Sequence, residues 1–236
     1  MANFVLLHGA FHGAWCWRDV AQRLRASGHA VTTPTQTGLG ERRHLLSGTI
    51  TLETFVEDLV QHLDNEDITE AVLVGHSFGG HAITGAADRV PGRIRHLVYL
   101  DAALLEHGET PFSRGLAETA AAREREARAF GGFTIPAPPP EAFGVPPGPL
   151  ADWLASRLCP HPLRTFQTPL TLRNKPGNGL PATYICCTAP IYANLASSRE
   201  RARARPGMAW RELATGHDAM VTAPDATAQL LMDIAR

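Results

Sequence analysis

The chain has 236 residues, of which 44% are hydrophobic, and its formal net charge is −1 at pH 7. This length can bury one sizeable core, so we expect a single domain, residues 1–236, that carries an insertion. No long run of one charge sign occurs, which argues against a nucleic-acid-binding role, and we expect the densest basic segment, residues 199–205, to be the solvated face of a helix.

Short apolar runs alternate with segments of helical period along the chain. The runs predicted as strands are residues 4–7, 30–32, 71–74, 96–100, 183–187 and 208–213. Between the second and third runs, apolar residues recur at i, i+3 and i+4 from Leu52 to Leu63, which predicts a helix with Thr51 as its N-cap. A last helix is expected to begin at Pro224, since proline suits a first helical position.

This alternation predicts an α/β fold, with a mostly parallel, doubly wound sheet of about six strands covered on both faces. Right-handed crossovers place the carboxyl ends of such strands along one edge, where functional sites collect. On this interpretation Ser77, residues 8–10, Asp101 and the segment after Cys187 all lie at that edge.

Residues 104–178 break the pattern, because no strand is predicted among them. They hold an Arg/Glu/Ala-rich helix near 114–129, a proline-dense stretch at 135–149 and a shorter amphipathic helix around Trp153, Leu154 and Leu158. We interpret the segment as a helical lid inserted between the fourth and fifth strands. Five aromatic side chains in it need an apolar surface to cover: Phe130, Phe133, Phe143, Trp153 and Phe166.

The most informative motif is Gly75-His76-Ser77-Phe78-Gly79, which follows the predicted strand 71–74 and precedes a helix. A Gly-x-Ser-x-Gly in that context is typical of a nucleophile elbow, in which the serine sits on a sharp, strained turn. Glycine on either side of the serine lets neighbouring backbone approach closely. We therefore predict that Ser77 is a nucleophile.

A serine hydroxyl needs a base within hydrogen-bond reach. His217 is the best candidate because it follows the last predicted strand and comes after Ser77 in the chain. His76 neighbours the serine but points along the turn, and we assign His81 to the substrate pocket instead. Phe11 and Trp153 complete the residues expected to line that pocket.

The oxyanion that forms during acyl transfer needs hydrogen-bond donors. His8-Gly9-Ala10 follows the first predicted strand, where one donor is expected. We assign the oxyanion hole to the backbone N–H groups of Ala10 and Phe78, and a structural role to His8.

The acid that orients His217 is not at its commonest position, the loop after residue 187, where no carboxylate occurs before Glu200. The strand 96–100 ends at Asp101, beside the elbow strand, and we predict that Asp101 is the acid. Two alternatives stay open, a Ser77–His217 dyad without an acid and Glu200 on a helix. Asp218 is adjacent to His217 and poorly placed to reach its ring.

These stretches together resemble the α/β-hydrolase fold family, and more closely its branch of plant methylesterases, hydroxynitrile lyases and small bacterial esterases. The resemblance rests on residues 4–17, 75–80 and 216–218, and on residues 37–42 and 98–102 for the bacterial members. It implies a hydrolase without metal or cofactor that acts through an acyl-serine. Hydroxynitrile lyases of this branch carry a lysine after the catalytic histidine, whereas this chain has Asp218, whose charge would repel cyanide.

We therefore expect a serine esterase for a small-to-medium, largely apolar carboxylic ester; a lactone, thioester or amide would suit the same machinery. A hydroxynitrile-lyase-like enzyme and a non-catalytic small-molecule receptor on the same fold are the alternatives. The expected partner is the small-molecule ester, with no nucleic acid and no membrane, and a homodimer is left open.

The sequence also bears on location. The N-terminus lacks the basic start and long apolar stretch of a signal peptide, and no apolar run approaches membrane-spanning length. The four cysteines show no Cys-x-x-Cys spacing, and two are adjacent inside a predicted strand, which favours reduced, buried thiols. We therefore expect a cytoplasmic protein.

Overall fold

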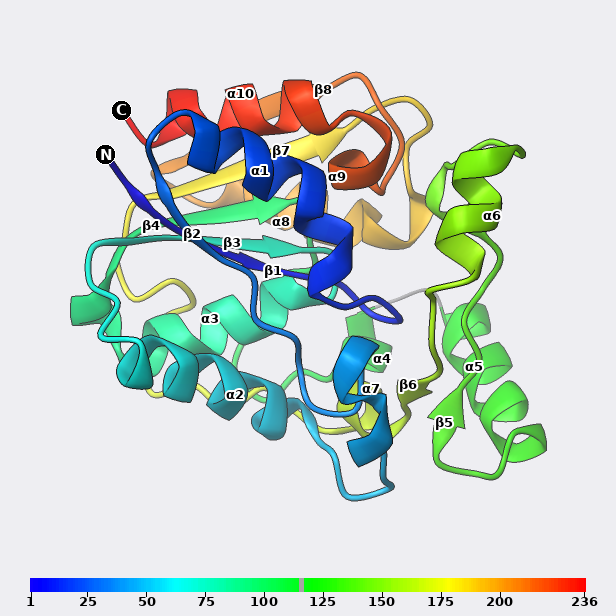
Figure 1. Ribbon diagram of the computed structural model, residues 1–236. Helices are drawn as coiled ribbons and strands as arrows, with labels where there is room; N and C mark the ends of the chain where they lie inside the picture. Colours follow the sequence, from blue (N-terminus) through cyan, green and yellow to red (C-terminus); the bar gives the residue numbers. More distant parts are fainter. Residues whose placement is uncertain (115–116) are drawn as a thin grey trace.

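The computed structural model describes residues 1–114 and 117–236. In them a six-stranded, fully parallel sheet runs through the molecule in the order β2-β1-β3-β4-β7-β8 (Figure 1). Its strands are β1 (Asn3–Leu7), β2 (Ala30–Thr32), β3 (Ala71–His76), β4 (Ile94–Leu100), β7 (Ala182–Cys187) and β8 (Met208–Leu213). Each of the six predicted strands is confirmed, and the strand order changes direction next to β1 and β3, where sites form in open α/β sheets.

Helices cover both faces of the sheet. On one face lie α1 (Arg18–Ala26), α9 (Ala219–Thr222) and α10 (Pro224–Ile234); on the other lie α2 (Leu52–Asn65), α3 (Gly79–Arg89) and α8 (Ala196–Ala204). Successive strand side chains point to opposite faces. Leu6 and Val74 therefore belong to the core beneath α1, α9 and α10, whereas Leu7 and Leu73 belong to the core beneath α2, α3 and α8. Each strand is therefore apolar on both sides, as a doubly covered parallel sheet requires.

Two predicted helix starts are confirmed. The Thr51 side chain accepts a hydrogen bond from the Thr54 backbone N–H, and the Thr54 side chain reaches back to the Thr51 N–H, so α2 begins with a capping box. Helix α10 begins at Pro224. Both helices carry a buried apolar stripe against the sheet, which accounts for their stability in this context.

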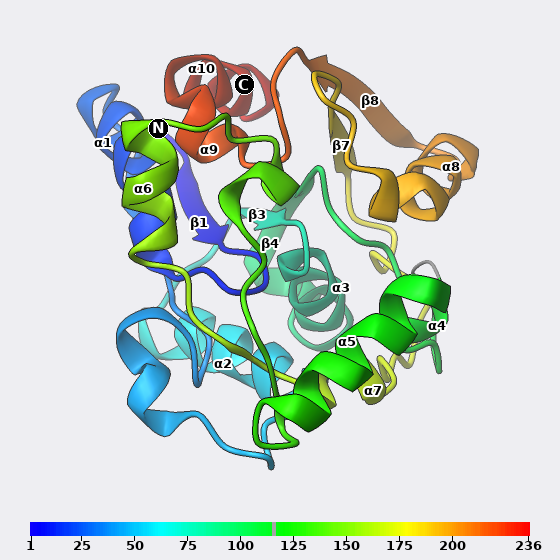
Figure 2. The same ribbon diagram turned by 90° about the vertical axis from the view of Figure 1, so that its right-hand side faces the viewer.

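The lid lies between the fourth and fifth strands of the sheet, as predicted, and sits over the carboxyl ends of the strands (Figures 1 and 2). Its elements are α4 (Pro111–Arg114), α5 (Ala117–Ala129), β5 (Thr134–Ile135), α6 (Pro149–Ala155), β6 (His161–Pro162) and α7 (Arg164–Gln167). Part of the predicted helix 114–129, residues 115–116, lies outside the described residues.

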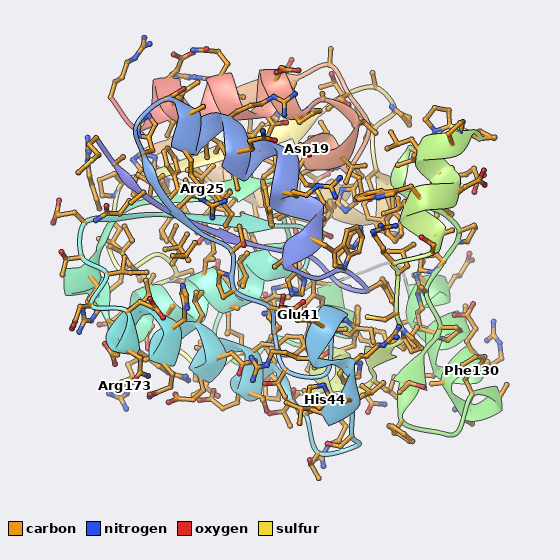
Figure 3. All side chains as sticks on the ribbon, in the orientation of Figure 1. Asp19, Arg25, Glu41, His44, Phe130 and Arg173 are labelled. Atoms are coloured by element: carbon orange, nitrogen blue, oxygen red, sulfur yellow. The ribbon has the colours of Figure 1, made fainter. Side chains whose placement is uncertain are left out.

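Three expectations for the lid are corrected. The segment is not free of strands, because β5 and β6 pair antiparallel. The predicted amphipathic helix ends at Ala155, before Leu158. Phe130 and Phe133 are 57% and 42% exposed instead of buried, and Phe130 points outward at the rim of the lid (Figure 3).

The basic segment 199–205 is a solvated face only in part, at residues such as Arg203, which is exposed. Arg201 and Arg205, on and just after α8, are mostly buried and pair with Glu109 and Glu106 of the segment after β4. Their ion pairs attach α8 to that segment. Among the described residues, no helix is both long and apolar enough to cross a membrane.

Candidate active site

Ser77 lies on a strained turn between β3 and α3. Its φ is +53°, a left-handed value that costs about 1 kcal/mol or more for a residue with a Cβ. A Cβ at Gly75 would lie 2.8 Å from the Gly79 carbonyl oxygen, and one at Gly79 would lie 2.7 Å from the His8 carbonyl oxygen. Only glycine fits at either position, so the elbow geometry predicted from the motif is present.

The structure brings the three predicted catalytic side chains into one hydrogen-bonded row. Ser77 Oγ lies 2.8 Å from His217 Nε2, and His217 Nδ1 lies 2.7 Å from Asp101 Oδ2. Since Asp101 is an acceptor, Nδ1–H donates to it and Nε2 is free to accept the Ser77 hydroxyl proton. His217 and Asp101 are 1% and 0% exposed, so this row is shielded from water on the side away from Ser77.

Two residues that sequence reasoning did not single out surround the acid and the base. The Tyr192 ring stacks on the His217 ring at a centroid distance of 4.1 Å. Arg199 Nη1 lies 3.8 Å from Asp101 Oδ1 and donates to the Tyr192 carbonyl oxygen. Glu200, the alternative acid, is exposed on α8. The loop after β7, which lacks the usual carboxylate, thus supplies an aromatic ring that covers one face of the His217 imidazole.

Ala10 and Phe78, whose amides are predicted to form the oxyanion hole, both line the cavity in front of Ser77. Among the described residues, neither the Ala10 N–H nor the Phe78 N–H donates to a protein acceptor. Phe11, next to Ala10, has φ +68°, so the loop after β1 is strained where it faces the serine. Both donors are free to bind an oxygen that develops charge there.

His8 has the structural role expected for it. Its Nδ1–H donates to the Gly9 carbonyl oxygen at 2.8 Å, and its Nε2 accepts from the Gln36 N–H at 3.1 Å. Burial lowers the pKa of His8 to about 3, so its ring is neutral. This neutral ring holds the loop that carries Ala10 against the segment around Gln36.

His12 is a second buried histidine of the loop after β1, but it lies beside a carboxylate, a feature that sequence reasoning missed. Its Nδ1 lies 2.7 Å from the Ala10 carbonyl oxygen and its Nε2 lies 3.0 Å from Asp218 Oδ2. Burial lowers the pKa of His12, but the charge and hydrogen bond of Asp218 outweigh it and raise that pKa above its usual value. The Asp218 pKa is in turn held below its usual value despite burial, because His12 lies beside it.

The pair is a buried salt bridge between the oxyanion loop and the residue after His217. Asp218 lies away from the cavity and does not line it. The two acceptors around His12, Ala10 O and Asp218 Oδ2, are the groups a doubly protonated ring requires. Asp218 thus neutralises the charge of the imidazolium that fixes the Ala10 peptide.

His76 packs behind the base. Its Nε2 donates to the His217 carbonyl oxygen at 3.0 Å, and burial followed by the charge of His217 holds the pKa of His76 well below its usual value. Donor atoms of His76, His217 and Asp218 lie within 4.8 Å of one another, a spacing that a metal ion could use. Both His217 nitrogens already face Ser77 and Asp101, so a metal there would compete with the Ser77–His217 contact.

A cavity of about 880 Å³, including the part open to solvent, lies in front of Ser77 beneath the lid. Phe11 and His81 line it as predicted. Trp153 does not, and this expectation is corrected: its ring packs edge-on against Trp15 at 5.5 Å, with Arg157 stacked on its face, on the side of α6 toward α1.

His161, in the lid strand β6, is a further residue that sequence reasoning missed. Its Nδ1 accepts from the Phe11 N–H at 3.3 Å and its Nε2–H donates to Thr165. The Cys159 N–H donates to the Phe11 carbonyl oxygen. The lid is therefore fastened to the residue beside Ala10, a long-range contact that no local pattern could reveal.

A parallel sheet with a strand–serine–helix elbow at its carboxyl edge, a histidine after the last strand and amides after the first defines the α/β-hydrolase class. A model described as the alpha/beta hydrolase family matches residues 4–230. The chain belongs to this family.

Three relatives with assigned activities are similar in sequence to this chain. The chain is 39% identical to a carbendazim-hydrolysing esterase of Nocardioides sp. (strain SG-4G), and the match covers 98% of both chains. It is 34% identical to methylesterase 7 and 36% identical to an α-hydroxynitrile lyase, both of Arabidopsis thaliana, over 46% of this chain and 43% of each relative.

Solved structures share the fold over the whole chain. An extracellular α/β-hydrolase from a Paenibacillus species, with structural and functional homology to tobacco salicylic acid binding protein 2, is 26% identical; the match has a TM-score of 0.87 and covers 100% of this chain and 99% of that one. Tomato methylketone synthase I is 22% identical, with a TM-score of 0.81, over 99% and 97% of the two chains. The latter likeness concerns the fold alone, which hosts more than one chemistry.

Proposed function

We propose that this protein hydrolyses a carboxylic ester of a small-to-medium, largely apolar molecule through an acyl-Ser77 intermediate. The row of contacts from Ser77 Oγ through His217 to Asp101, at 2.8 and 2.7 Å, carries the proposal. These distances are within the range for a nucleophile, its base and the group that orients the base. The esterase of Nocardioides, similar along nearly the whole chain, supports the same reaction class.

The proposed reaction has two halves. Ser77 Oγ attacks the ester carbonyl carbon while His217 Nε2 takes the hydroxyl proton, and the carbonyl oxygen becomes an oxyanion held by the Ala10 and Phe78 N–H groups. The intermediate collapses, the alcohol leaves with the proton from His217, and the acyl group stays on Ser77. Water, deprotonated by His217, then releases the acid and restores the serine.

The cavity supports a largely apolar substrate. Its walls include Phe78, Phe112 and Phe166, whose rings lie 4.6 to 5.2 Å apart. Residues 104–178, which supply much of this wall, are proposed to act as the lid. Lactones and thioesters present the same reacting carbonyl, so the cavity and not the elbow selects among them.

A carbamate is a second candidate substrate, because the Nocardioides relative hydrolyses carbendazim, a methyl carbamate. Attack by Ser77 on that carbonyl uses the same groups, with methanol as the leaving alcohol. Carbendazim therefore belongs in the substrate panel beside simple esters.

Two other functions are weaker. A lyase that holds cyanide by a lysine after the catalytic histidine is disfavoured, since Asp218 occupies that position and is engaged by His12. A receptor without turnover would not require the Ser77–His217 contact at 2.8 Å.

The decisive experiment measures hydrolysis of p-nitrophenyl acetate, p-nitrophenyl butyrate and carbendazim by the wild type and by Ser77→Ala. The wild type should turn over at least one substrate, and the variant should lose about 10³-fold or more in kcat. Equal rates for the two proteins, or no turnover by either, would overturn the proposal in favour of binding without reaction.

We further propose a cytoplasmic location and a small-molecule partner, without nucleic acid or membrane. The four cysteines, all buried and unpaired, support a reducing compartment. A homodimer is tested by size-exclusion chromatography with light scattering, which separates 25.5 kDa from twice that mass.

A further inference from the structure

His81 lies on α3, four residues after Ser77, and its side chain lines the same cavity. It is 2% exposed. Its ring stands edge-on to Phe78, with the two centroids 4.7 Å apart.

His81 differs from every other buried histidine of residues 1–114 and 117–236. His8, His12, His76, His161 and His217 each make at least one hydrogen bond to the protein. His81 makes none: its Nδ1 is sealed from solvent without a partner, whereas its Nε2 is not among the sealed atoms and is the ring nitrogen open to the cavity. An unpaired ring nitrogen that lines a cavity is available to a polar group of a ligand.

Burial lowers the pKa of His81 to about 3, so its ring is neutral in the physiological range. A neutral imidazole offers one N–H donor and one acceptor nitrogen. It pairs with a neutral hydroxyl, N–H or ring nitrogen, and it gives no Coulombic attraction to an anion.

The cationic side chains of the cavity do not compete for this role. Arg114 Nε lies 3.6 Å from Glu109 Oε1, and Arg123 Nη1 lies 3.6 Å from Glu126 Oε2. Each guanidinium therefore already has a carboxylate within 4 Å. Glu109 also acts electrostatically on His81, but among the described residues the His81 ring makes no hydrogen bond.

The shape of the cavity near His81 favours a flat group. Phe166 lies between Phe78 and Phe112, with centroids 4.6 and 5.2 Å away, and tilts by 48° and 34° relative to them. Aromatic walls of this kind favour a ring that packs by offset stacking or edge to face. A flexible alkyl chain gains less from them.

We propose that His81 is a specificity residue that binds an uncharged hydrogen-bonding group on an aromatic ring of the substrate. The substrate class is therefore an ester or carbamate of a hydroxylated or nitrogen-containing aromatic system. This inference rests on the proposed esterase function and names the substrate of that same site.

The test compares matched pairs of esters that differ only in the polar group. For a ring in the acid part, the pair is methyl 6-hydroxy-2-naphthoate and methyl 2-naphthoate; for a ring in the alcohol part, it is quinolin-6-yl acetate and 2-naphthyl acetate. The proteins are the wild type, His81→Leu, His81→Gln and His44→Gln. His44 is the control because it is an exposed histidine that does not line the cavity.

The measured quantity is the ratio of kcat/KM for the polar ester to kcat/KM for its apolar partner. His81→Leu should lower this ratio about tenfold in at least one pair, the value expected for one lost hydrogen bond in a closed site. His81→Gln should restore part of it, and His44→Gln should leave it unchanged. The pair that responds shows which part of the substrate carries the ring.

An unchanged ratio in both pairs, with hydrolysis intact, overturns the inference and leaves the esterase proposal standing. Loss of all hydrolysis by the wild type instead overturns the esterase proposal itself. If His81→Leu does not fold, judged by its thermal transition, His81→Ala takes its place: a ratio equal to that of the wild type in both pairs overturns the inference.

Discussion

The sheet edge around Ser77 and the lid above it are built by different forces. At the edge, residues from β1, β3, β4 and the segment after β8 meet through backbone contacts and buried hydrogen bonds, and their side chains are almost fully covered. The lid is fastened at a few points, such as His161 to Phe11, and otherwise rests on packed aromatic rings, with Phe130 left in solvent. Positions that fix the reacting groups therefore tolerate little change, whereas the lid is free to vary with the substrate.

The largest effect should come from the acid of the sheet edge. Asp101→Asn should cut kcat by on the order of 10²–10⁴, because asparagine can turn its N–H₂ to His217 Nδ1 and leave Nε2 protonated, the wrong tautomer for accepting the Ser77 proton. Steady-state hydrolysis of p-nitrophenyl butyrate measures it. Glu200→Gln, on the exposed face of α8, is the control and should keep the wild-type rate. A near-wild-type rate for Asp101→Asn would point to a Ser77–His217 dyad.

The second-largest effect should be a loss of folding stability at acidic pH, caused by buried histidines near the sheet edge. The folded-state pKa values of His8 and His81, about 3 each, lie below the unfolded value near 6.5, so the unfolded chain binds more protons between these limits. Stability therefore falls as pH drops below 6.5, by about 1 kcal/mol per pH unit for each histidine. At pH 5 the two together should cost about 4 kcal/mol. Urea unfolding at pH 7 and pH 5 measures this loss.

The matched variants separate buried from surface histidines. His81→Leu removes one of the two contributions and should reduce the loss between pH 7 and pH 5 by about 2 kcal/mol. His44→Gln alters an exposed side chain (Figure 3) and should leave it unchanged. Equal acid sensitivity in all three proteins would contradict the assignment of neutral, buried rings.

The next prediction concerns the stability that the buried His12–Asp218 salt bridge contributes at the sheet edge. Asp218→Asn leaves the His12 ring without its counterion and should cost about 3 kcal/mol in urea unfolding at pH 6. The double variant His12→Asn/Asp218→Asn should recover part of that loss, because no unpaired charge remains. Asp233→Asn, on the exposed side of α10, is the control.

The pair also has a pH signature. Because the folded-state pKa of His12 is raised, its contribution is fully present below pH 6.5 and is lost as pH rises through that raised value. The depressed pKa of Asp218 keeps its contribution present above about pH 4. Asp218→Asn should therefore flatten the alkaline decline in stability that the wild type shows.

The same contrast explains what could be predicted from the sequence. The strands, the capped helix after Thr51 and the elbow at Ser77 follow from local patterns, and Asp101 follows from strand order, because parallel strands bring their carboxyl ends together. The His12–Asp218 and His161–Phe11 contacts join residues 206 and 150 positions apart, so no periodicity reports them. In the lid, an aromatic side chain signals burial only on average, which is why the expectation holds for Phe143 and Phe166 and fails for Phe130 and Phe133. Trp153 is packed, but against Trp15 and not at the cavity.

The smallest effect should separate two phenylalanines of the lid. Phe166 packs between Phe78, Phe112 and His161, so Phe166→Ala should cost about 2 kcal/mol in urea unfolding and lower kcat/KM for aryl esters by loosening the cavity wall. Phe130→Ala removes a side chain that is 57% exposed and should change stability by less than about 0.5 kcal/mol, with kcat/KM unaltered. If Phe130→Ala instead matched Phe166→Ala in both measurements, the outer rim of the lid would take part in substrate binding. The lid would then be as sensitive to substitution at its rim as at the cavity wall, which contradicts the contrast between a fixed edge and a variable lid.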